Sequence, residues 1–259
     1  KAKVPREVLG LRSSENYTDP GDAARVATIY NGLSGRGLFV PFRKGDPEGS
    51  RWTDNEPLFI DWSRDSVAVL QENPKSRWQG HEYFLLPGVS WTRGANHVPI
   101  KGKLAPSGIM DVNAMKLSSA CDREISSLFL LATLNSDVFS FFLKKFIAHT
   151  WMAQISDLRQ MPVVMPTKGQ EKRLAQLAER AIEAKRLTFG NAAPSNELAA
   201  FVRTLGDELA SRAPAYLRPP AQRRLLETPT DCLAVIELAV NWEAEKLYGL
   251  EGLGPFDEF

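Results

Sequence analysis

The pattern of apolar and polar residues divides the chain into two parts of different character. From Gly32 to Val112, short apolar runs are separated by Gly, Pro, Asn and Asp, a pattern typical of strands joined by turns. The connections from Arg43 to Asn55 and from Pro87 to Pro106 are long, and we expect them to be loops of the kind that carry binding residues. Strands are predicted for the runs at 38–42, 57–62, 82–87 and 108–112.

Most of the remaining chain has apolar residues at intervals of three and four, which predicts helices. A short helix is expected over 22–30, and a longer helical stretch over 122–146 is interrupted by Leu-Asn-Ser-Asp at 134–137. The proline-flanked segment 161–166 is predicted to be extended. Capping signals predict further helices that begin after Thr167, Ser195 and Thr228.

Together these patterns predict an α+β fold. Residues 1–165 would form a β-rich module with flanking helices, and residues 166–259 a helical spacer followed by a C-terminal helical region. A chain of 259 residues with 43% apolar composition is long enough for two modest domains. The longest apolar stretch, 128–146, is interrupted by polar residues and does not reach the roughly 20 residues of a membrane span. We therefore expect no membrane partner.

Charge and cysteine content narrow the setting of the protein. The net charge of +1 conceals an acidic C-terminal segment, 228–259, in which seven carboxylates accompany one lysine, so the rest of the chain is basic. That distribution is compatible with a nucleic-acid partner. Cys121 and Cys232 are too few for a disulfide scaffold, which favours a cytoplasmic protein. The sequence begins with Lys1 rather than Met, and we expect it to be a piece of a longer protein.

Familiar catalytic signatures are missing from the sequence. The glycines of GLSGRG at 32–37 do not match the dinucleotide-binding fingerprint, and there is no phosphate-binding loop or serine-hydrolase elbow. Glu-Ala-Lys at 183–185 matches half of a nuclease motif, but it lies in a predicted helix without a preceding Pro-Asp at a suitable spacing. The Asn-Pro-Pro-aromatic tetrapeptide of amino-methyltransferases is also absent, and His81, His97 and His149 lack metal-site spacing. We predict no catalytic residues, metal site or cofactor in this chain.

Basic and aromatic residues occur together in the loops of the β-rich part. Arginine can grip guanine edges or phosphates, lysine supplies a point charge, and aromatic rings stack on exposed bases. The alternative is that the tryptophans are core residues and the arginines belong to a solvated surface. The candidate DNA contacts are Arg36, Arg43, Lys44, Arg51, Trp52, Arg77, Trp91, Arg93, Lys101 and Lys103.

Several segments, taken in order, resemble one protein family. The run GLFVPFRKGDPEGSRWTDNEPLFIDWSRD at 37–65 is similar to the segment that follows the catalytic domain in adenine-specific DNA methyltransferases of type IIG restriction–modification systems and of BREX phage defence. The later pieces keep the family's order, and the resemblance covers residues 30–190. These pieces are PGVSWTR at 87–93, GIMDV at 108–112, LLATLNSDVFSFFLK at 130–144 and HTWMAQISDLRQMPVVMP at 149–166.

The resemblance implies that the chain is the C-terminal target recognition (specificity) region of such an enzyme. In that family a mixed α/β module reads DNA bases and a helical segment spaces it, and Gln154, Asp157 and Pro162 match its architecture. Expected partners are double-stranded DNA and an upstream methyltransferase domain or subunit. That part would bind S-adenosylmethionine and methylate a flipped adenine at N6. The family's base-contacting loops vary too much to identify individual contact residues.

Two other functions stay open. A protein-interaction or assembly domain would dock a partner through its helices and acidic tail without touching DNA. A small enzyme with an unrecognised site is disfavoured, because the histidines and carboxylates form no constellation. If Arg43 reads a base, Arg43→Ala should weaken binding to cognate DNA by about 1–3 kcal/mol.

Overall fold

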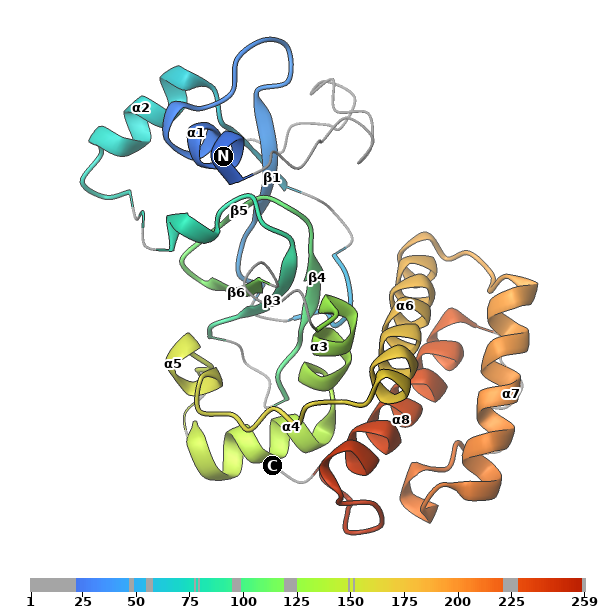
Figure 1. Cartoon of the computed structure of the whole chain (residues 1–259). Helices are drawn as coiled ribbons and strands as arrows, with labels where there is room; N and C mark the ends of the chain where they lie inside the picture. Colours follow the sequence, from blue (N-terminus) through green and yellow to red (C-terminus); the bar gives the residue numbers. More distant parts are fainter. Residues whose placement is uncertain are drawn as a thin grey trace.

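The protein has an α+β fold with a helical C-terminal region, as predicted. The computed structural model describes residues 22–46, 49–54, 58–76, 78, 80–94, 99–118, 125–148, 150, 152–220 and 228–257. These residues contain two three-stranded sheets. Figure 1 shows the sheets on one side of the molecule and three long C-terminal helices on the other, with helix α3 (Ser127–Leu134) between them.

The first sheet forms a small core with two helices. Its strands are β2 (Leu58–Asp61), β1 (Phe39–Arg43) and β5 (Ile109–Met110), in that order. β1 pairs antiparallel with β2 and parallel with β5. Helices α1 (Asp22–Asn31) and α2 (Arg64–Glu72) contact each other beside this sheet. The buried residues here, which we name the N-terminal core, are Ile29, Val40, Trp62, Val67, Phe84, Leu85 and Ile109.

Two elements in this part differ from the sequence predictions. Helix α2 was not predicted; it begins after Ser63, whose Oγ accepts a hydrogen bond from the Ser66 amide at 3.3 Å. The run at 82–87 is predicted to be a strand, and that prediction is wrong. His81–Tyr83 forms a 3₁₀ helix, η2, and Leu85 has a left-handed backbone with φ of 62°. A strand cannot continue through such a residue, because strands need negative φ.

The second sheet lies largely where a loop is predicted. It consists of β4 (Lys103–Ala105), β3 (Gly88–Thr92) and β6 (Ala114–Ser118), with β3 antiparallel to both neighbours. Because β3 and β4 fall within Pro87–Pro106, the prediction of a loop over that whole segment is wrong. The first four residues of β3 are all buried, so the strand lacks the apolar–polar alternation that marks a strand with one exposed face.

The predicted interrupted helical stretch is confirmed. Helix α3 is followed by α4 (Asp137–Phe142), which continues into a π-helix, η4 (Leu143–Ile147). The break is capped by Ser136, whose Oγ accepts from the Phe139 amide at 3.3 Å. No single helix of the described residues is long and apolar enough to cross a membrane; α3 and the α4–η4 stretch pass that test only as a pair bent by 63°.

The three long C-terminal helices begin where the capping signals predict. Helix α6 (Lys168–Gly190) follows Thr167, α7 (Asn196–Arg212) follows Ser195, and α8 (Pro229–Tyr248) follows Thr228. Each cap hydroxyl accepts a hydrogen bond from the amide three residues later, at 3.1–3.3 Å.

These helices share one core with α3 and the second sheet, which we name the main core. Its buried residues include Val89 and Trp91 of β3, Phe129 and Leu131 of α3, Leu177 of α6, Val202 of α7 and Ile236 of α8. The predicted boundary between residues 165 and 166 therefore separates elements that are packed together.

The segment after β1 is tied to α8 by polar contacts. Trp52 is fully buried, and its Nε1 donates to Glu237 Oε1 at 2.8 Å. Arg51 lies 3.7 Å from Glu237 and 3.9 Å from Asp137. The side chain of Asn241, also on α8, hydrogen-bonds to Asp137 and accepts from its amide at 2.9 Å. Residues distant in sequence thus hold the connection between β1 and β2 against the helical region.

Candidate functional site

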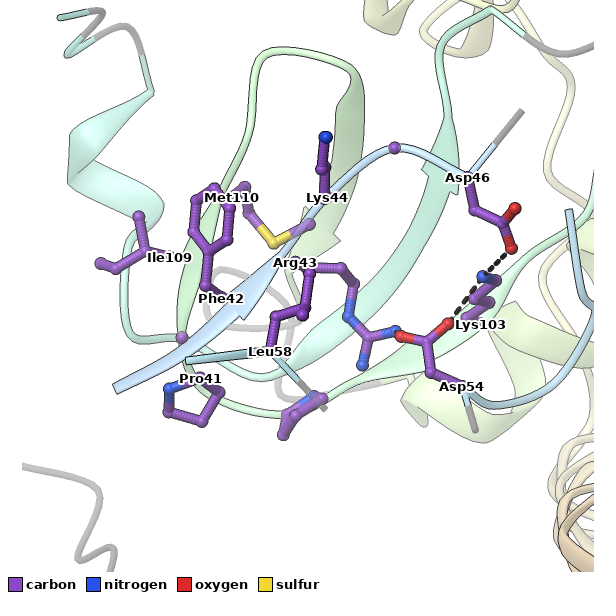
Figure 2. Close-up of a pocket in the computed structure, with 13 residues that line it drawn as sticks. Pro41, Phe42, Arg43, Lys44, Asp46, Asp54, Leu58, Lys103, Ile109 and Met110 are labelled. Atoms are coloured by element: carbon purple, nitrogen blue, oxygen red, sulfur yellow. Dashed lines mark hydrogen bonds and ion pairs between the residues drawn. The ribbon is translucent and has the colours of Figure 1, made fainter. Parts of the chain in front are cut away.

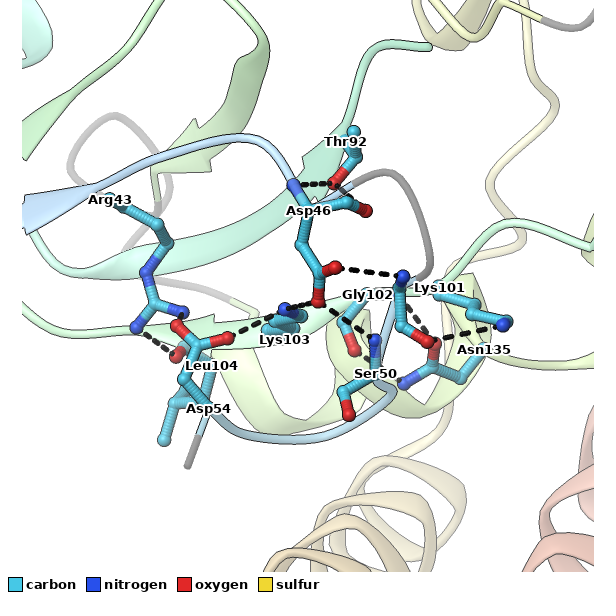
Figure 3. Close-up of polar contacts among 11 residues, drawn as sticks. Arg43, Asp46, Ser50, Asp54, Thr92, Lys101, Gly102, Lys103, Leu104 and Asn135 are labelled. Carbon is cyan, nitrogen blue, oxygen red and sulfur yellow. Dashed lines mark hydrogen bonds and ion pairs between the residues drawn. The ribbon is translucent and has the colours of Figure 1, made fainter. Parts of the chain in front are cut away.

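A chain of four alternating charges lies between the two sheets (Figure 3). The Arg43 guanidinium pairs with Asp54 and also donates to the Leu104 carbonyl at 3.0 Å. Lys103 Nζ lies 2.6 Å from Asp54 and 2.8 Å from Asp46. The side chains of Arg43 and Lys103 are only 14% and 8% exposed. The four charges therefore balance one another in a partly desolvated place, as buried charges must.

Local hydrogen bonds hold these four charged side chains in place. Asp46 accepts from the amides of Gly49 at 3.0 Å and Ser50 at 3.2 Å, and its own amide donates to Thr92 Oγ1 at 2.9 Å. Burial acts to raise the pKa of Asp46, but the hydrogen bond from Lys103 and those two amides hold this pKa below its ordinary value. Burial lowers the pKa of the Arg43 guanidinium, partly offset by Asp54.

The same residues form one side of a cavity between β1, β4 and β5, with a volume of about 330 Å³ (Figure 2). We name it the β1–β5 cavity. Gly108 lines it because the chain there passes close to β1: a Cβ at Gly108 would lie 2.4 Å from the Pro41 carbonyl oxygen. Lys44 is exposed at the same cavity and has no ion-pair partner in the described part of the chain. Lys44 is therefore the lining cation available to an incoming anion.

A larger cavity, about 570 Å³, lies along the outer edge of β6, and we name it the β6-edge cavity. It is lined by η2, by the turn between β5 and β6, by β6 itself and by the short helix α5 (Ile155–Leu158). β6 is the last strand of its sheet in the order β4–β3–β6, so its outer edge carries no strand among the described residues. Its three cationic lining residues are Arg93, Lys116 and Arg159.

Lys116 sits at the η2 side of this cavity. Its Nζ donates to the carbonyl oxygens of Tyr83 and Leu86, both at 2.9 Å. Burial, followed by the positive charges of Arg25 and Arg43, lowers the pKa of Lys116 to about 8. An ammonium group has three donors. The neutral carbonyls do not balance its charge, so an anion in the cavity would stabilise the protonated form.

Arg93 and Arg159 lie at the α5 side. Arg93 follows β3, and its backbone pairs with Asn113 at 2.8 Å and with Ala153 at 2.8 Å. Its Nε is buried without a hydrogen-bond partner among the described residues. Arg159 is exposed, one residue beyond α5. A buried guanidinium nitrogen without a partner is costly, which makes Arg93 a good candidate to bind a ligand.

A third cavity, about 350 Å³, lies beside the N-terminal core and is lined by Trp62, Trp78 and Lys75. Met110 lines all three cavities, so they adjoin one another around β5. We refer to this surface as the hollowed face. Its cations without a carboxylate partner among the described residues are Lys44, Lys75, Arg93, Lys116 and Arg159. Asp111 is the lining carboxylate outside the four-charge chain.

The candidate contacts from the sequence are scattered through different environments. Trp52, Trp91 and Lys103 are buried, and Trp91 Nε1 donates to the Ala153 carbonyl at 2.9 Å. The charged groups of Arg43, Arg51 and Lys101 have partners, the last donating to the Gly49 carbonyl at 3.1 Å. Arg36 and Lys44 are exposed, Arg93 lines the β6-edge cavity, and Arg77 lies outside the described residues.

Two cations of the β6-edge cavity were missed by sequence reasoning. Lys116 lies in the strand Ala-Met-Lys-Leu-Ser, where one lysine indicates a solvated strand face. Arg159 belongs to the segment treated as architecture, and its neighbours do form a local cap: the Gln154 amide donates to Asp157 Oδ2 at 2.8 Å. The sequence signal that could have identified Lys116 was its position between apolar residues of a strand.

The site offers charge and hydrogen-bonding groups rather than evident catalytic machinery. Within the described ranges, no group of three or more His, Cys, Asp or Glu side chains is placed to hold a metal ion. Comparison of the chain with models of protein families, and with curated proteins, finds no match.

Proposed function

We propose that this chain is a DNA sequence-recognition domain that directs adenine-N6 methylation by a methyltransferase domain or subunit, in a restriction–modification or phage-defence system. The observation that carries the proposal is the hollowed face, where cations from separate elements lie around adjoining cavities without carboxylate partners among the described residues. The family resemblance of residues 30–190 supplies the methylation context. The cytoplasm is the expected setting.

The charge arrangement favours a polyanion over a single small acid. Arg43, Lys103, Asp46 and Asp54 pair with one another, so together they add no net charge to the face. The cations left over come from the end of β1, the α2–η2 connection, the end of β3, β6 and the residue after α5. Cations spread over a surface in this way suit a backbone of repeated phosphates, which provides affinity, while cavities with hydrogen-bonding groups suit base readout.

The rest of the fold would act as a support. β3 and β6 border the β6-edge cavity, and β3 shares the main core with α6 and α8. A loop presented by such a core keeps its position when it meets DNA, which lowers the entropic cost of binding. We assign methyl transfer and S-adenosylmethionine binding to the methyltransferase part and no chemical step to the residues described here.

The direct experiment is a salt titration of duplex binding, followed by selection from a randomised duplex library. Each phosphate contact contributes about 0.9 to the slope of log affinity against log salt concentration. We expect the triple substitution Lys44→Ala, Arg93→Ala, Arg159→Ala to reduce that slope by about 2 to 3. The control is Arg203→Ala, an exposed arginine on α7, which should leave the slope unchanged. With wild-type protein, the selection should enrich one defined duplex sequence.

Either of two results would overturn the proposal. The first is duplex binding whose slope is the same in the triple variant and in wild type. The second is a selected library without any enriched sequence, which would leave only non-specific attraction.

A specific observation favours one second function, an assembly domain that does not touch DNA. Phe146 and Met165 are 65% and 63% exposed. The Phe146 ring lies 5.7 Å from Phe142, which stacks on Tyr248, and the Tyr248 hydroxyl donates to the Pro162 carbonyl at 2.9 Å. Rings that contact one another in this way form an apolar patch with an exposed member, and such patches mark contact surfaces. Under this alternative, Phe146→Ser and Met165→Ser would abolish binding to the methyltransferase part, while the triple cation variant would bind it normally.

A further inference from the structure

The β6-edge cavity is larger than a phosphate contact needs, and its lining combines apolar with polar and charged residues. A phosphate is bound by donors at a surface, whereas this cavity has a volume of about 570 Å³, within the range of sites for whole small ligands. The apolar side chains that line it, which we call its apolar wall, include Phe84, Met110, Met115 and Ile155. Such a wall fits the flat face of a nucleobase.

The cations lie on two sides of that wall. In the register of β3 and β6, Trp91 lies opposite Met115 and Ser90 opposite Lys116. Paired residues point to the same face of a sheet, and successive residues to opposite faces. Met115 therefore lies on the same side as Trp91 and the main core, and Lys116 on the other side, towards the carbonyls of Tyr83 and Leu86. Because β6 is an edge strand, the cavity is lined from both sides.

Polar groups suited to the edge of a base line the same space. Asp111 keeps one carboxylate oxygen for a ligand, since its Oδ1 accepts from the Asn113 amide at 2.8 Å. Ser156 and Gln154 are exposed at the α5 side. Carboxylates accept from exocyclic amino groups of bases, and Gln and Ser can both donate and accept. The cavity thus combines an apolar wall, hydrogen-bonding groups and cations.

We infer that the β6-edge cavity binds one nucleotide, with the base against the Met110–Met115 wall and a phosphate held by Arg93 or Lys116. The ligand class is a nucleoside phosphate. This inference rests on the proposed DNA-binding function, under which the ligand is a nucleotide of the duplex whose base has left the stack. A free nucleotide has the same chemistry. Arg93 would gain the hydrogen-bond partner that its buried Nε lacks among the described residues, and Lys116 a negative charge beside its ammonium group.

The test uses the full chain and two probes. The first probe is free deoxynucleoside monophosphate, with inorganic phosphate alone as its comparison, measured by calorimetry. The second is the duplex selected above, with 2-aminopurine at successive positions, since its fluorescence rises when the base leaves the stack. The cavity is filled by Ser156→Trp, with Ser156→Ala as the matched control. Val112→Trp, at a residue 43% exposed on the rim, is a second filling variant should the first be poorly folded.

We expect a monophosphate to bind at least about tenfold more tightly than inorganic phosphate, and Ser156→Trp to weaken it by about tenfold or more. Ser156→Ala should change it by less than about twofold. With DNA, one 2-aminopurine position should brighten on binding to wild type and stay dark with Ser156→Trp. Affinity for the monophosphate should fall between pH 7 and pH 9, as Lys116 loses its proton.

The outcomes separate this inference from the proposed function. If monophosphate binds but no duplex does, the nucleotide site stands with a free nucleotide as its ligand, and the DNA-binding proposal fails. If duplex binds sequence-specifically but no 2-aminopurine position brightens and no monophosphate binds, the DNA-binding proposal stands and the nucleotide site is refuted. Equal affinity for phosphate and monophosphate would also refute it, because the base would then contribute nothing.

Discussion

Asp54 is the carboxylate on which Arg43 and Lys103 converge, and Asp54→Asn tests how far this charge chain stabilises the fold. Asparagine keeps the size of the side chain but removes its charge. Removing one partner of a buried ion pair costs about 3–5 kcal/mol, because the remaining charge is left desolvated. Asp54 is 28% exposed, Lys103 keeps Asp46 and Arg43 keeps the Leu104 carbonyl. We therefore expect the lower end of that range, about 3 kcal/mol.

The assay is urea unfolding at pH 7, followed by tryptophan fluorescence. With a slope of about 3 kcal/mol per molar urea, the midpoint should fall by about 1 M. Asp207→Asn, at an exposed carboxylate on α7, is the control and should stay within about 0.5 kcal/mol of wild type. The double variant Arg43→Met, Asp54→Leu should recover part of the loss, because it removes charge from both sides. A loss below about 1 kcal/mol for Asp54→Asn would refute the reasoning, since that is the value of a surface pair.

Three further predictions follow from single contacts. Gly108→Ala should destabilise the protein by about 1–3 kcal/mol or more in urea unfolding, because its Cβ would lie 2.4 Å from the Pro41 oxygen; a neutral result would mean that β1 and β5 can separate freely. Lys116 has a folded pKa of about 8 against 10.5, so the unfolded chain binds more protons between these values and stability rises with pH there. Lys116→Met should remove that rise, and unchanged pH dependence of the urea midpoint would contradict the burial of the ammonium group. Thr167→Ala should cost about 0.5–2 kcal/mol in thermal unfolding by losing the hydrogen bond from the Gln170 amide, and a wild-type melting curve would exclude a capping role.

The three long C-terminal helices were predictable because their signals are local. Thr167, Ser195 and Thr228 cap helices through atoms three residues away, so the sequence contains both partners. β3 was not predictable in the same way. Its first residues are buried by α3 and the neighbouring strands, so the strand shows no alternation, and its Gly and Ser resemble a turn. Leu85 was also misleading, since nothing in an apolar run signals a left-handed φ.

The composition of the candidate site was predictable from the sequence, but the individual residues that form it were not. Arg43 and Lys44 are neighbours in sequence, yet Arg43 pairs with Asp54 while Lys44 is exposed. Which of two adjacent cations is used internally depends on carboxylates that the fold brings near. The same holds for the tryptophans: Trp52 meets Glu237 across 185 positions of sequence, a contact that no local pattern encodes. The DNA contacts therefore stay a prediction, and the proposed contact residues are now those that line the hollowed face.

If the chain reads DNA as proposed, the shared main core limits how it could acquire a new specificity. Val89 and Trp91 of β3 are buried together with Leu177 of α6, so replacing the strands that support the cavities would require matching changes in the helices. Lys44, Val112 and Ser156 line the cavities but are exposed, so they can vary at little cost to stability. New specificities should therefore arise by changes at the cavity rims, on an almost constant interior. Exchange between relatives should succeed when these rims are transplanted and fail when single strands are.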